Sequence, residues 1–268
     1  MACDQPSKVE SSDATEAYAE GNLFIIGGGS RSLSLMKEMV DLSVSPDGYI
    51  LVMSQSSSEP DTSFYYVAKQ FRELTARPIR HVDSLQIQLF DLDSIRNADL
   101  IYMTGGDQNR FKRNVPQEAV EAMKTAYQNG ATIAGTSAGA ALMSAVMITG
   151  DQKNQPEYES TYRRLEYDNA ITTEGLGFLD SVVVDQHFVA RSRYNRILSL
   201  MADLDYPIGA GIEESTALVV YPKGATVVGE GQVVVFERPK GYRKHNNKIG
   251  FKDMNLNAYL EGDTFQLN

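Results

Sequence analysis

The chain has 268 residues, of which 42% are hydrophobic and 22% charged, a composition typical of a globular protein with a sizeable buried core. Its formal net charge of -10 repels nucleic-acid phosphates and anionic lipid, so nucleic acid is set aside as a partner. The single cysteine, Cys3, leaves no intramolecular disulfide, no multi-cysteine zinc site and no cysteine nucleophile within the fold.

Residues 1–21 are polar and poor in strand-forming side chains, which predicts a disordered tether ahead of the folded domain. Cys3 follows a small residue and precedes this tether, as at the junction of a bacterial lipoprotein whose hydrophobic signal has been replaced by Met1. An ordinary disordered terminus with an incidental cysteine is the alternative. The first interpretation implies a periplasmic or extracellular lipoprotein anchored through Cys3, and the second is compatible with the cytoplasm.

From Asn22 onward, short apolar runs alternate with longer amphipathic ones. Strands are expected within residues 22–29, 49–57, 98–108 and 132–137, and helices within 31–42, 61–76 and 117–130. In the first helix Leu33, Met36 and Met39 or Val40 are expected on one buried face, and Asp61 is a candidate N-cap of the second helix. Alternation in this order predicts right-handed crossovers, and therefore a doubly wound α/β sandwich with a mostly parallel sheet.

The pattern loosens after Ser144. Residues 151–175 are polar, and we interpret them as an excursion over the surface that forms part of a site rim. A strand within 181–188 and a helix within 191–204 follow. From Gly209 on, short valine-rich runs separated by turn residues predict antiparallel strands at a sheet edge. Residues 22–268 are thus expected to form a single α/β domain.

Residues 131–150 carry no charge, but their glycines, serines and threonines and their flanking patterns favour a buried strand and helix over a membrane span. Within this run, Gly135 to Gly139 have the form Gly-x-Ser-x-Gly. Small neighbours are what a strand-to-helix turn needs if Ser137 is to stand clear of the backbone as a nucleophile. The Ala138 amide, at the start of the next helix, could then bind a developing oxyanion. A tight packing turn without catalysis is the alternative interpretation.

A serine nucleophile needs a base, and the chain has three histidines. His187 ends the apolar run 181–188, at the carboxyl end of a predicted strand, where open α/β sheets place their ligands. His81 and His245 lie among charged residues and are expected at the surface. His187 is therefore the candidate base, with a structural histidine as the alternative.

Spacing does not choose the carboxylate that would orient this base. Asp151 and Asp168 suit the order of an α/β-hydrolase, whereas Glu213 and Glu214 suit another topology. In an extended chain adjacent side chains point to opposite sides, so only one of the two glutamates could face the site.

Two glycine-rich turns follow predicted strands. Gly105 and Gly106 offer amides to a ligand beside the Gln108 side chain. Residues 27–30 could mimic a dinucleotide-binding loop. However, the glycine that this loop has at its sixth position is absent, and no acidic residue closes the next predicted strand.

Arg191, Arg193 and Arg196 follow the candidate base at the start of a helix, against the helix dipole. On a helix Arg193 and Arg196 share a face and Arg191 points elsewhere, so at most two of them would clamp one carboxylate.

Four motifs in this order resemble the cyanophycinases, serine peptidases related to aspartyl dipeptidase, and the match runs from about Leu23 to the end of the chain. They are MTGGDQ (103–108), GTSAGAALMS (135–144), DQHFVARSRYNR (185–196) and GIEESTALVV (211–220). The resemblance implies a flavodoxin-like fold akin to class I glutamine amidotransferases, with serine in place of their cysteine. It also implies an exopeptidase that hydrolyses β-aspartyl-arginine linkages of the storage polymer cyanophycin and releases dipeptides.

Carried over by matching motif, the resemblance makes Ser137 the nucleophile, His187 the base and Glu214 the orienting acid. In the mechanism expected from these roles, amides near Gly106 and Ala138 bind the oxyanion. The positions that match substrate-holding residues are Gln108, Asp185, Gln186, Arg191, Arg193 and Arg196. Asp185 would pair with the guanidinium of the substrate and the arginines with its carboxylates. The resemblance requires no metal and no cofactor.

Residues 151–175 match these motifs least, and the Cys3 terminus suggests scavenging of polymer or isoaspartyl peptides outside the cell. A peptidase of small aspartyl or isoaspartyl dipeptides and a catalytically silent peptide-binding protein are therefore the alternatives. The sequence leaves the oligomeric state open, a homodimer included.

Overall fold

The computed structural model describes residues 21–43, 45, 48–82, 92–155, 157, 161–237 and 240–267. Cys3 and residues 1–20 of the expected tether lie outside these ranges.

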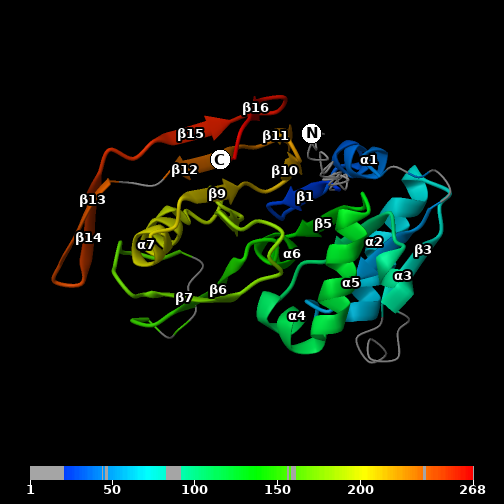
Figure 1. The fold of residues 1–268 in the computed structure, drawn as a ribbon, viewed down its shortest axis with the longest axis horizontal. Helices are drawn as coiled ribbons and strands as arrows, with labels where there is room; N and C mark the ends of the chain where they lie inside the picture. Colours follow the sequence, from blue (N-terminus) through cyan, green and yellow to red (C-terminus); the bar gives the residue numbers. More distant parts are fainter. Residues whose placement is uncertain are drawn as a thin grey trace, which may run out of the picture.

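Within the described residues, the larger sheet, called the main sheet below, has eight strands in the order β16-β11-β10-β1-β5-β4-β2-β3 (Figure 1). Its parallel strands are β1 (Leu23–Ile26), β5 (Thr132–Thr136), β4 (Leu100–Met103), β2 (Ile50–Met53) and β3 (Ile79–Val82). Its antiparallel strands are β10 (Thr216–Tyr221), β11 (Gly224–Gly229) and β16 (Thr264–Phe265). The predicted fold class, a mostly parallel sheet with antiparallel strands near the C-terminus, is confirmed.

Helices cover both faces of this sheet because its strands are apolar on both sides. One face is covered by α1 (Leu33–Asp41) and α2 (Pro60–Leu74), which share an apolar cluster with Phe24 and Ile26 of β1. The other face is covered by α3 (Leu92–Arg96), α4 (Gln108–Asn114) and α5 (Gln117–Gln128), which share a second cluster with Leu23 and Ile25. Successive side chains of β1 therefore point to opposite faces of the sheet and into different clusters, which is the period-2 pattern of a strand.

Two details of the first helices differ from the sequence-based expectations. Leu33 is 48% exposed, and Leu35 takes its place on the buried face of α1 with Met36, Met39 and Val40. In α2 the N-cap is Glu59, with Pro60 directly after it, and Asp61 lies within the first turn. There its carboxylate faces the positive end of the helix dipole.

A second sheet, of four strands within the described residues, lies beside the first in the order β15-β12-β9-β8. Its strands are β8 (Val182–Gln186), β9 (Ile208–Ile212), β12 (Val233–Glu237) and β15 (Leu256–Tyr259), and α7 (Tyr194–Leu204) packs against it at the end of the molecule opposite α2 and α3 (Figure 1). The C-terminal strands thus divide between two sheets rather than forming one edge. The chain crosses between the sheets at residues 213–215, directly after β9 and before β10.

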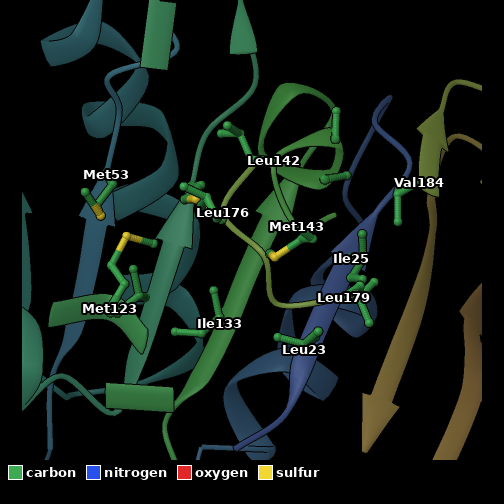
Figure 2. Packing of buried hydrophobic residues seen from close by; sticks show 14 of the residues in the cluster. Leu23, Ile25, Met53, Met123, Ile133, Leu142, Met143, Leu176, Leu179 and Val184 are labelled. Carbon is green, nitrogen blue, oxygen red and sulfur yellow. The ribbon is translucent and has the colours of Figure 1, made fainter. Parts of the chain in front are cut away.

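The two sheets share one apolar core. Val182 and Val184 of β8 lie in the same cluster as Leu23 and Ile25 of β1, whereas Val183 packs on the α7 side. Figure 2 shows Ile25 on β1 and Val184 on β8 within this shared cluster. This packing fixes the carboxyl ends of β1, β5 and β8 relative to one another.

The charge-free run folds into three short elements. After β5, α6 (Ala138–Ala141) makes a single helical turn, and β6 (Val146–Gln152) follows. The apolar helix expected after Ser137 is therefore only four residues long. Among the described residues, no helix is both long and apolar enough to cross a membrane.

The remaining strands of the described residues form two antiparallel pairs. β6 pairs with β7 (Ala170–Glu174), and β13 (Lys240–His245) pairs with β14 (Lys248–Lys252). The polar excursion expected over residues 151–175 is thus partly a strand pair.

Candidate active site

Ser137 occupies the turn between β5 and α6 in a backbone conformation that L-residues rarely adopt, with φ 53° and ψ -107°. Its neighbours are small because the turn is crowded: a Cβ on Gly139 would lie 2.6 Å from the carbonyl oxygen of Met103 in β4. A strained serine between a buried strand and a helix is the geometry of a nucleophile elbow.

His187 follows β8 directly, and its Nε2 lies 2.9 Å from the Oγ of Ser137. Its Nδ1 lies 2.5 Å from Oε1 of Glu214, at the crossover between the two sheets. A carboxylate can only accept a hydrogen bond, so with an ionised Glu214 the neutral ring carries its proton on Nδ1. Nε2 then presents a lone pair to the serine hydroxyl, which is the arrangement that a general base needs.

Burial lowers the pKa of His187 below its ordinary value of 6.5. The hydrogen bond to Glu214 acts in the opposite direction and favours the charged ring, while the nearby charge of Arg191 lowers the pKa further. The imidazole is therefore neutral, and able to accept a proton, at neutral pH.

The other carboxylates that spacing left open lie elsewhere. Glu213 Oε2 accepts hydrogen bonds from the backbone amides of Val189 and Ala190. Asp168 pairs with Lys153 at the surface, and Asp151 is one of the residues that line the cavity described below. Of the four, only Glu214 contacts His187 within the described residues.

The end of β1 and the turn after it bind the backbone at Ser137, at His187 and beside Glu214. Carbonyl oxygens of Ile26, Gly27 and Gly28 accept hydrogen bonds, in that order, from the amides of Ser137 (3.0 Å), His187 (2.7 Å) and Ser215 (2.9 Å). Three consecutive carbonyls thus set the spacing of three distant segments.

The side of this loop that faces the site has no room for side chains. A Cβ on Gly28 would lie 2.3 Å from Cε1 of His187, and one on Gly29 would lie 2.7 Å from Cβ of Glu214. Sequence reasoning weighed residues 27–30 only as a dinucleotide loop and missed this role, although three successive glycines after a buried strand were a signal of close backbone approach.

Two amides beside Ser137 are suited to bind an oxyanion. The turn after β4 comes close to the serine, since a Cβ on Gly105 would lie 3.4 Å from the Cβ of Ser137. Within the described residues, neither the Gly106 amide nor the Ala138 amide donates to a backbone carbonyl. Both therefore remain able to donate to a ligand oxygen.

A cavity of about 310 Å³ opens beside Ser137. Three cationic side chains line it, those of Arg191, Arg193 and Arg196, together with the acidic residues Asp107 and Asp151. Its other lining residues are Gly106, Gln108, Asn109, Ser137, Thr149, Gly150 and Gln186. A larger hollow of about 650 Å³, beside Pro207 and Lys240, includes none of the site residues.

Asp185 is placed differently from the expectation. It is 1% exposed, and its carboxylate binds Arg196 through both oxygens, with Nε 2.8 Å from Oδ2 and the terminal nitrogen on Oδ1. Arg193 lies 3.5 Å from the same Oδ1. The carboxylate of Asp185 is thus already engaged by two guanidinium groups of the chain itself, and it orients these arginines.

The two glutamines line the cavity from different elements. Gln108 donates from Nε2 to the carbonyl oxygens of Ile148 (2.8 Å) and Thr149 (3.0 Å), which fixes the start of α4 to β6. Oε1 of Gln186 is buried with no hydrogen-bond partner in the described part of the chain, so it is an acceptor that a bound ligand could satisfy.

The excursion after β6 holds the rim of the cavity. Thr161 donates to the carbonyl of Arg191, Asn195 donates to that of Tyr162 (2.9 Å), and the Tyr162 hydroxyl donates to that of Asp151 (2.6 Å). Burial raises the pKa of Tyr162 to about 12, so the phenol stays protonated and keeps donating. These contacts support the expectation that the segment forms part of a site rim.

The other histidines lie outside the cavity. His245 is exposed as expected, whereas His81 is only partly exposed: its Nε2 lies 2.7 Å from Ser54 Oγ, and its ring stacks on Phe64 at 4.2 Å. In the part of the chain that the structure describes, no group of three or more His, Cys, Asp or Glu side chains could hold a metal ion.

Comparison with known proteins assigns the family. The profile of peptidase family S51 matches residues 23–228, which is most of the chain. The chain belongs to peptidase family S51. This S51 peptidase is 29% identical over 246 residues to the cyanophycinase of Geminocystis herdmanii, covering 88% of each chain. It is 28% identical to the cyanophycinase of Trichormus variabilis, covering 91% of this chain and 85% of the relative.

Solved structures of peptidases share the fold. A peptidase from an acI-B1 Actinobacterium superposes with a TM-score of 0.66 at 19% identity, covering 94% of this chain and 98% of the other. A putative peptidase E from Listeria monocytogenes gives a TM-score of 0.53 at 17% identity, covering 80% of this chain and all of the other. The predictions of a cyanophycinase-like family and of a serine-type peptidase are confirmed at this level.

Proposed function

We propose that this S51 peptidase is a serine exopeptidase that releases β-aspartyl-arginine dipeptides from cyanophycin or related β-aspartyl peptides. The observation that supports it is the hydrogen-bonded series Ser137, His187 and Glu214 at the edge of a cavity that holds both cationic and acidic side chains. The names of the relatives, cyanophycinases at 25 to 29% identity, point the same way.

The chemistry follows from the hydrogen bonds. Ser137 Oγ attacks the scissile carbonyl while His187 Nε2 takes its proton, and Glu214 stabilises the resulting imidazolium. Amides of Gly106 and Ala138 bind the oxyanion. His187 then protonates the leaving amine, and a water activated by His187 hydrolyses the acyl-enzyme. A β-aspartyl-arginine dipeptide can be the product only if its own β-linkage stays intact. The bond broken in this proposal is therefore the one that joins the unit to the rest of the substrate, and not the β-aspartyl-arginine linkage that the sequence-based expectation named.

The charges of the cavity support the substrate class. A β-aspartyl-arginine unit carries at least one free carboxylate together with one guanidinium. Arg191, Arg193 and Arg196 can bind carboxylates, and Asp151, an exposed carboxylate in the lining, can bind the guanidinium that Asp185 has no room for. A volume of about 310 Å³ is at the small end of ligand cavities, which favours one dipeptide unit at a chain end.

Ser137→Ala tests the nucleophile. We expect dipeptide release from purified cyanophycin, measured by liquid chromatography, to fall at least about 10⁴-fold, because the remaining groups cannot form an acyl-enzyme. Ser34→Ala, at an exposed position of α1, is the control and should keep full activity. Unimpaired release by the Ser137 variant would exclude the mechanism. Labelling of Ser137 by a serine-directed phosphonate separates an enzyme from a silent peptide-binding protein, which would bind ligand without being labelled.

Asp151→Asn tests the substrate class. We expect kcat/KM for β-aspartyl-arginine substrates to fall about 10- to 100-fold, the value of a charge-assisted hydrogen bond, with little change for an analogue that has leucine in place of arginine. Asp180→Asn makes the same change of charge at an exposed position outside the cavity and should leave this preference unaltered. Equal losses on both substrates would contradict the role of Asp151. Faster turnover of free isoaspartyl dipeptides than of polymer would instead assign the enzyme to the dipeptidases.

A further inference from the structure

Glu213 is an acidic residue beside the candidate active site that the proposed mechanism does not use. Its neighbour Glu214 contacts the His187 ring, whereas Glu213 turns to the backbone: its Oε2 accepts from the amide of Val189 at 2.5 Å and from that of Ala190 at 3.0 Å. Two consecutive glutamates therefore hold the same loop, one through a side chain and one through the main chain.

The loop that Glu213 holds carries both the candidate base and the arginines. Within it, the amide of Arg191 donates to the carbonyl of His187 (3.0 Å), and that of Arg193 donates to the carbonyl of Phe188 (2.9 Å). These turns leave the amides of Val189 and Ala190 at the start of the loop without a carbonyl partner inside it. Glu213 satisfies both, as an N-cap side chain satisfies the first amides of a helix.

Glu213 is itself held by the second sheet. Its amide donates to the carbonyl of Gln232 (3.0 Å), and a Cβ on Gly231 would lie 2.8 Å from its Cγ. Its carboxylate therefore has little freedom to follow the loop if the loop moves. The loop is fixed relative to β9 and β12 rather than only to its own turns.

We propose that Glu213 is a positioning residue that fixes the loop from His187 to Arg193, and through it the distance from His187 to Ser137 and the placement of Arg191 and Arg193 in the cavity. The part of this inference that concerns the arginines rests on the proposed function. The part that concerns His187 and Ser137 needs only a reactive serine.

The test compares Glu213→Ala with Glu213→Gln. Alanine removes the acceptor, whereas the side-chain oxygen of glutamine can still accept from both amides. Glu261→Ala is the control, since Glu261 is exposed in the turn before β16. Thermal unfolding of all variants identifies any that fail to fold, and Glu213→Gln then carries the comparison.

Two readouts separate positioning from general destabilisation. The first is the rate at which a small serine-directed phosphonate labels Ser137, which needs His187 but not the arginines. The second is KM for dipeptide release, which depends on the arginines. For Glu213→Ala we expect labelling to slow by about tenfold or more and KM to rise by a similar factor, with Glu213→Gln within about threefold of wild type on both.

Wild-type rates in Glu213→Ala would overturn the proposal, as would a Glu213→Gln variant as defective as the alanine variant, because the effect would then come from charge and not from acceptance of the two hydrogen bonds. Failure of the proposed function looks different. In that case wild-type protein would not release dipeptides, while the labelling rates would still decide the role of Glu213.

Discussion

Ser137 (53°), His187 (48°) and Ser215 (55°) have positive φ angles although they are not glycine. Each such conformation costs about 1 to 2 kcal/mol in an L-residue. The amide of Ser137 donates to the last carbonyl of β1, and the amides of His187 and Ser215 donate to carbonyls of the turn after it. The turn that crowds the site therefore also holds its strained backbone. The strained backbone at Ser137 and His187 lets their side chains point toward each other, which a backbone with ordinary negative φ angles at these positions would not allow.

At the same scale, the environment of His187 predicts the pH dependence of activity. Burial, and then the charge of Arg191, lower its pKa below 6.5. The acid limb of kcat/KM should therefore lie below pH 6.5. Arg191→Gln removes a positive charge that disfavours the imidazolium, so the pKa should rise and the acid limb should shift to higher pH.

Rate profiles and a histidine chemical-shift titration both measure this shift. Arg72→Gln, which removes an exposed arginine from α2, is the control and should leave the limb in place. An acid limb that does not move in Arg191→Gln would contradict the electrostatic coupling.

The same pKa shift affects stability. Because the pKa of His187 is lower in the folded protein than in the unfolded chain, its contribution to the free energy of unfolding is present above pH 6.5 and is lost as the pH falls through the folded pKa.

At the scale of elements, the glycine turn after β1 is as much a part of the site as the segments that carry the side chains. We expect Gly28→Ala to lower kcat by about 100-fold or more, since a Cβ 2.3 Å from the imidazole must displace it, and a displacement of about 1 Å costs this much in rate. Steady-state kinetics, or labelling of Ser137, measures the loss.

Gly262→Ala is a matched control. Gly262 also has a positive φ, 85°, but a Cβ there meets nothing within 4 Å. Both substitutions pay the conformational cost of about 1 to 2 kcal/mol in unfolding free energy, and only the one at Gly28 should reduce activity. Similar activities in the two variants would refute the steric role of the turn.

The short helix α6 shows how neighbouring segments override a local pattern. The apolar residues after Ser137 favour a longer helix, but the carbonyls of Leu142 and Met143 accept from the amides of Leu176 and Phe178, and the amide of Ala145 donates to Leu179. These long-range hydrogen bonds replace the next helical turns and lead the chain into β6. A prediction from local periodicity has no access to such partners.

At the scale of the whole molecule, the candidate site lies where two sheets meet. Ser137 follows a strand of the main sheet, His187 follows a strand of the second sheet, and Glu214 lies on the crossover between the two sheets. The apolar cluster that includes Ile25 and Val184 holds the two sheets together (Figure 2). The distance from nucleophile to base is therefore a property of the packing between the sheets.

The net charge of the whole chain does not describe the charge of the cavity beside Ser137. The net charge of -10 suggests at most a weak preference for cationic ligands, yet three arginines line the cavity. Two of them, Arg193 and Arg196, share the buried carboxylate of Asp185. A sum over the chain says nothing about where charges gather, and only folding brings these together.

The sequence by itself predicted β1, β2, β4 and β5 and the helices α1, α2 and α5 in the first half of the chain, but not β3, α3 or α4. It also carried the family resemblance, because apolar period and motif order are local properties. It also selected Ser137 and His187 as candidates, through the small residues around one and the strand end before the other. Spacing left the orienting carboxylate open and the family resemblance pointed to Glu214, which is the one that contacts His187 in the structure. Only the tertiary structure decided that Asp185 is already paired, and that Glu213 and the turn after β1 hold the site. Those relations join residues far apart in the chain, and side-chain direction and burial, which select the partners, exist only once the two sheets have packed.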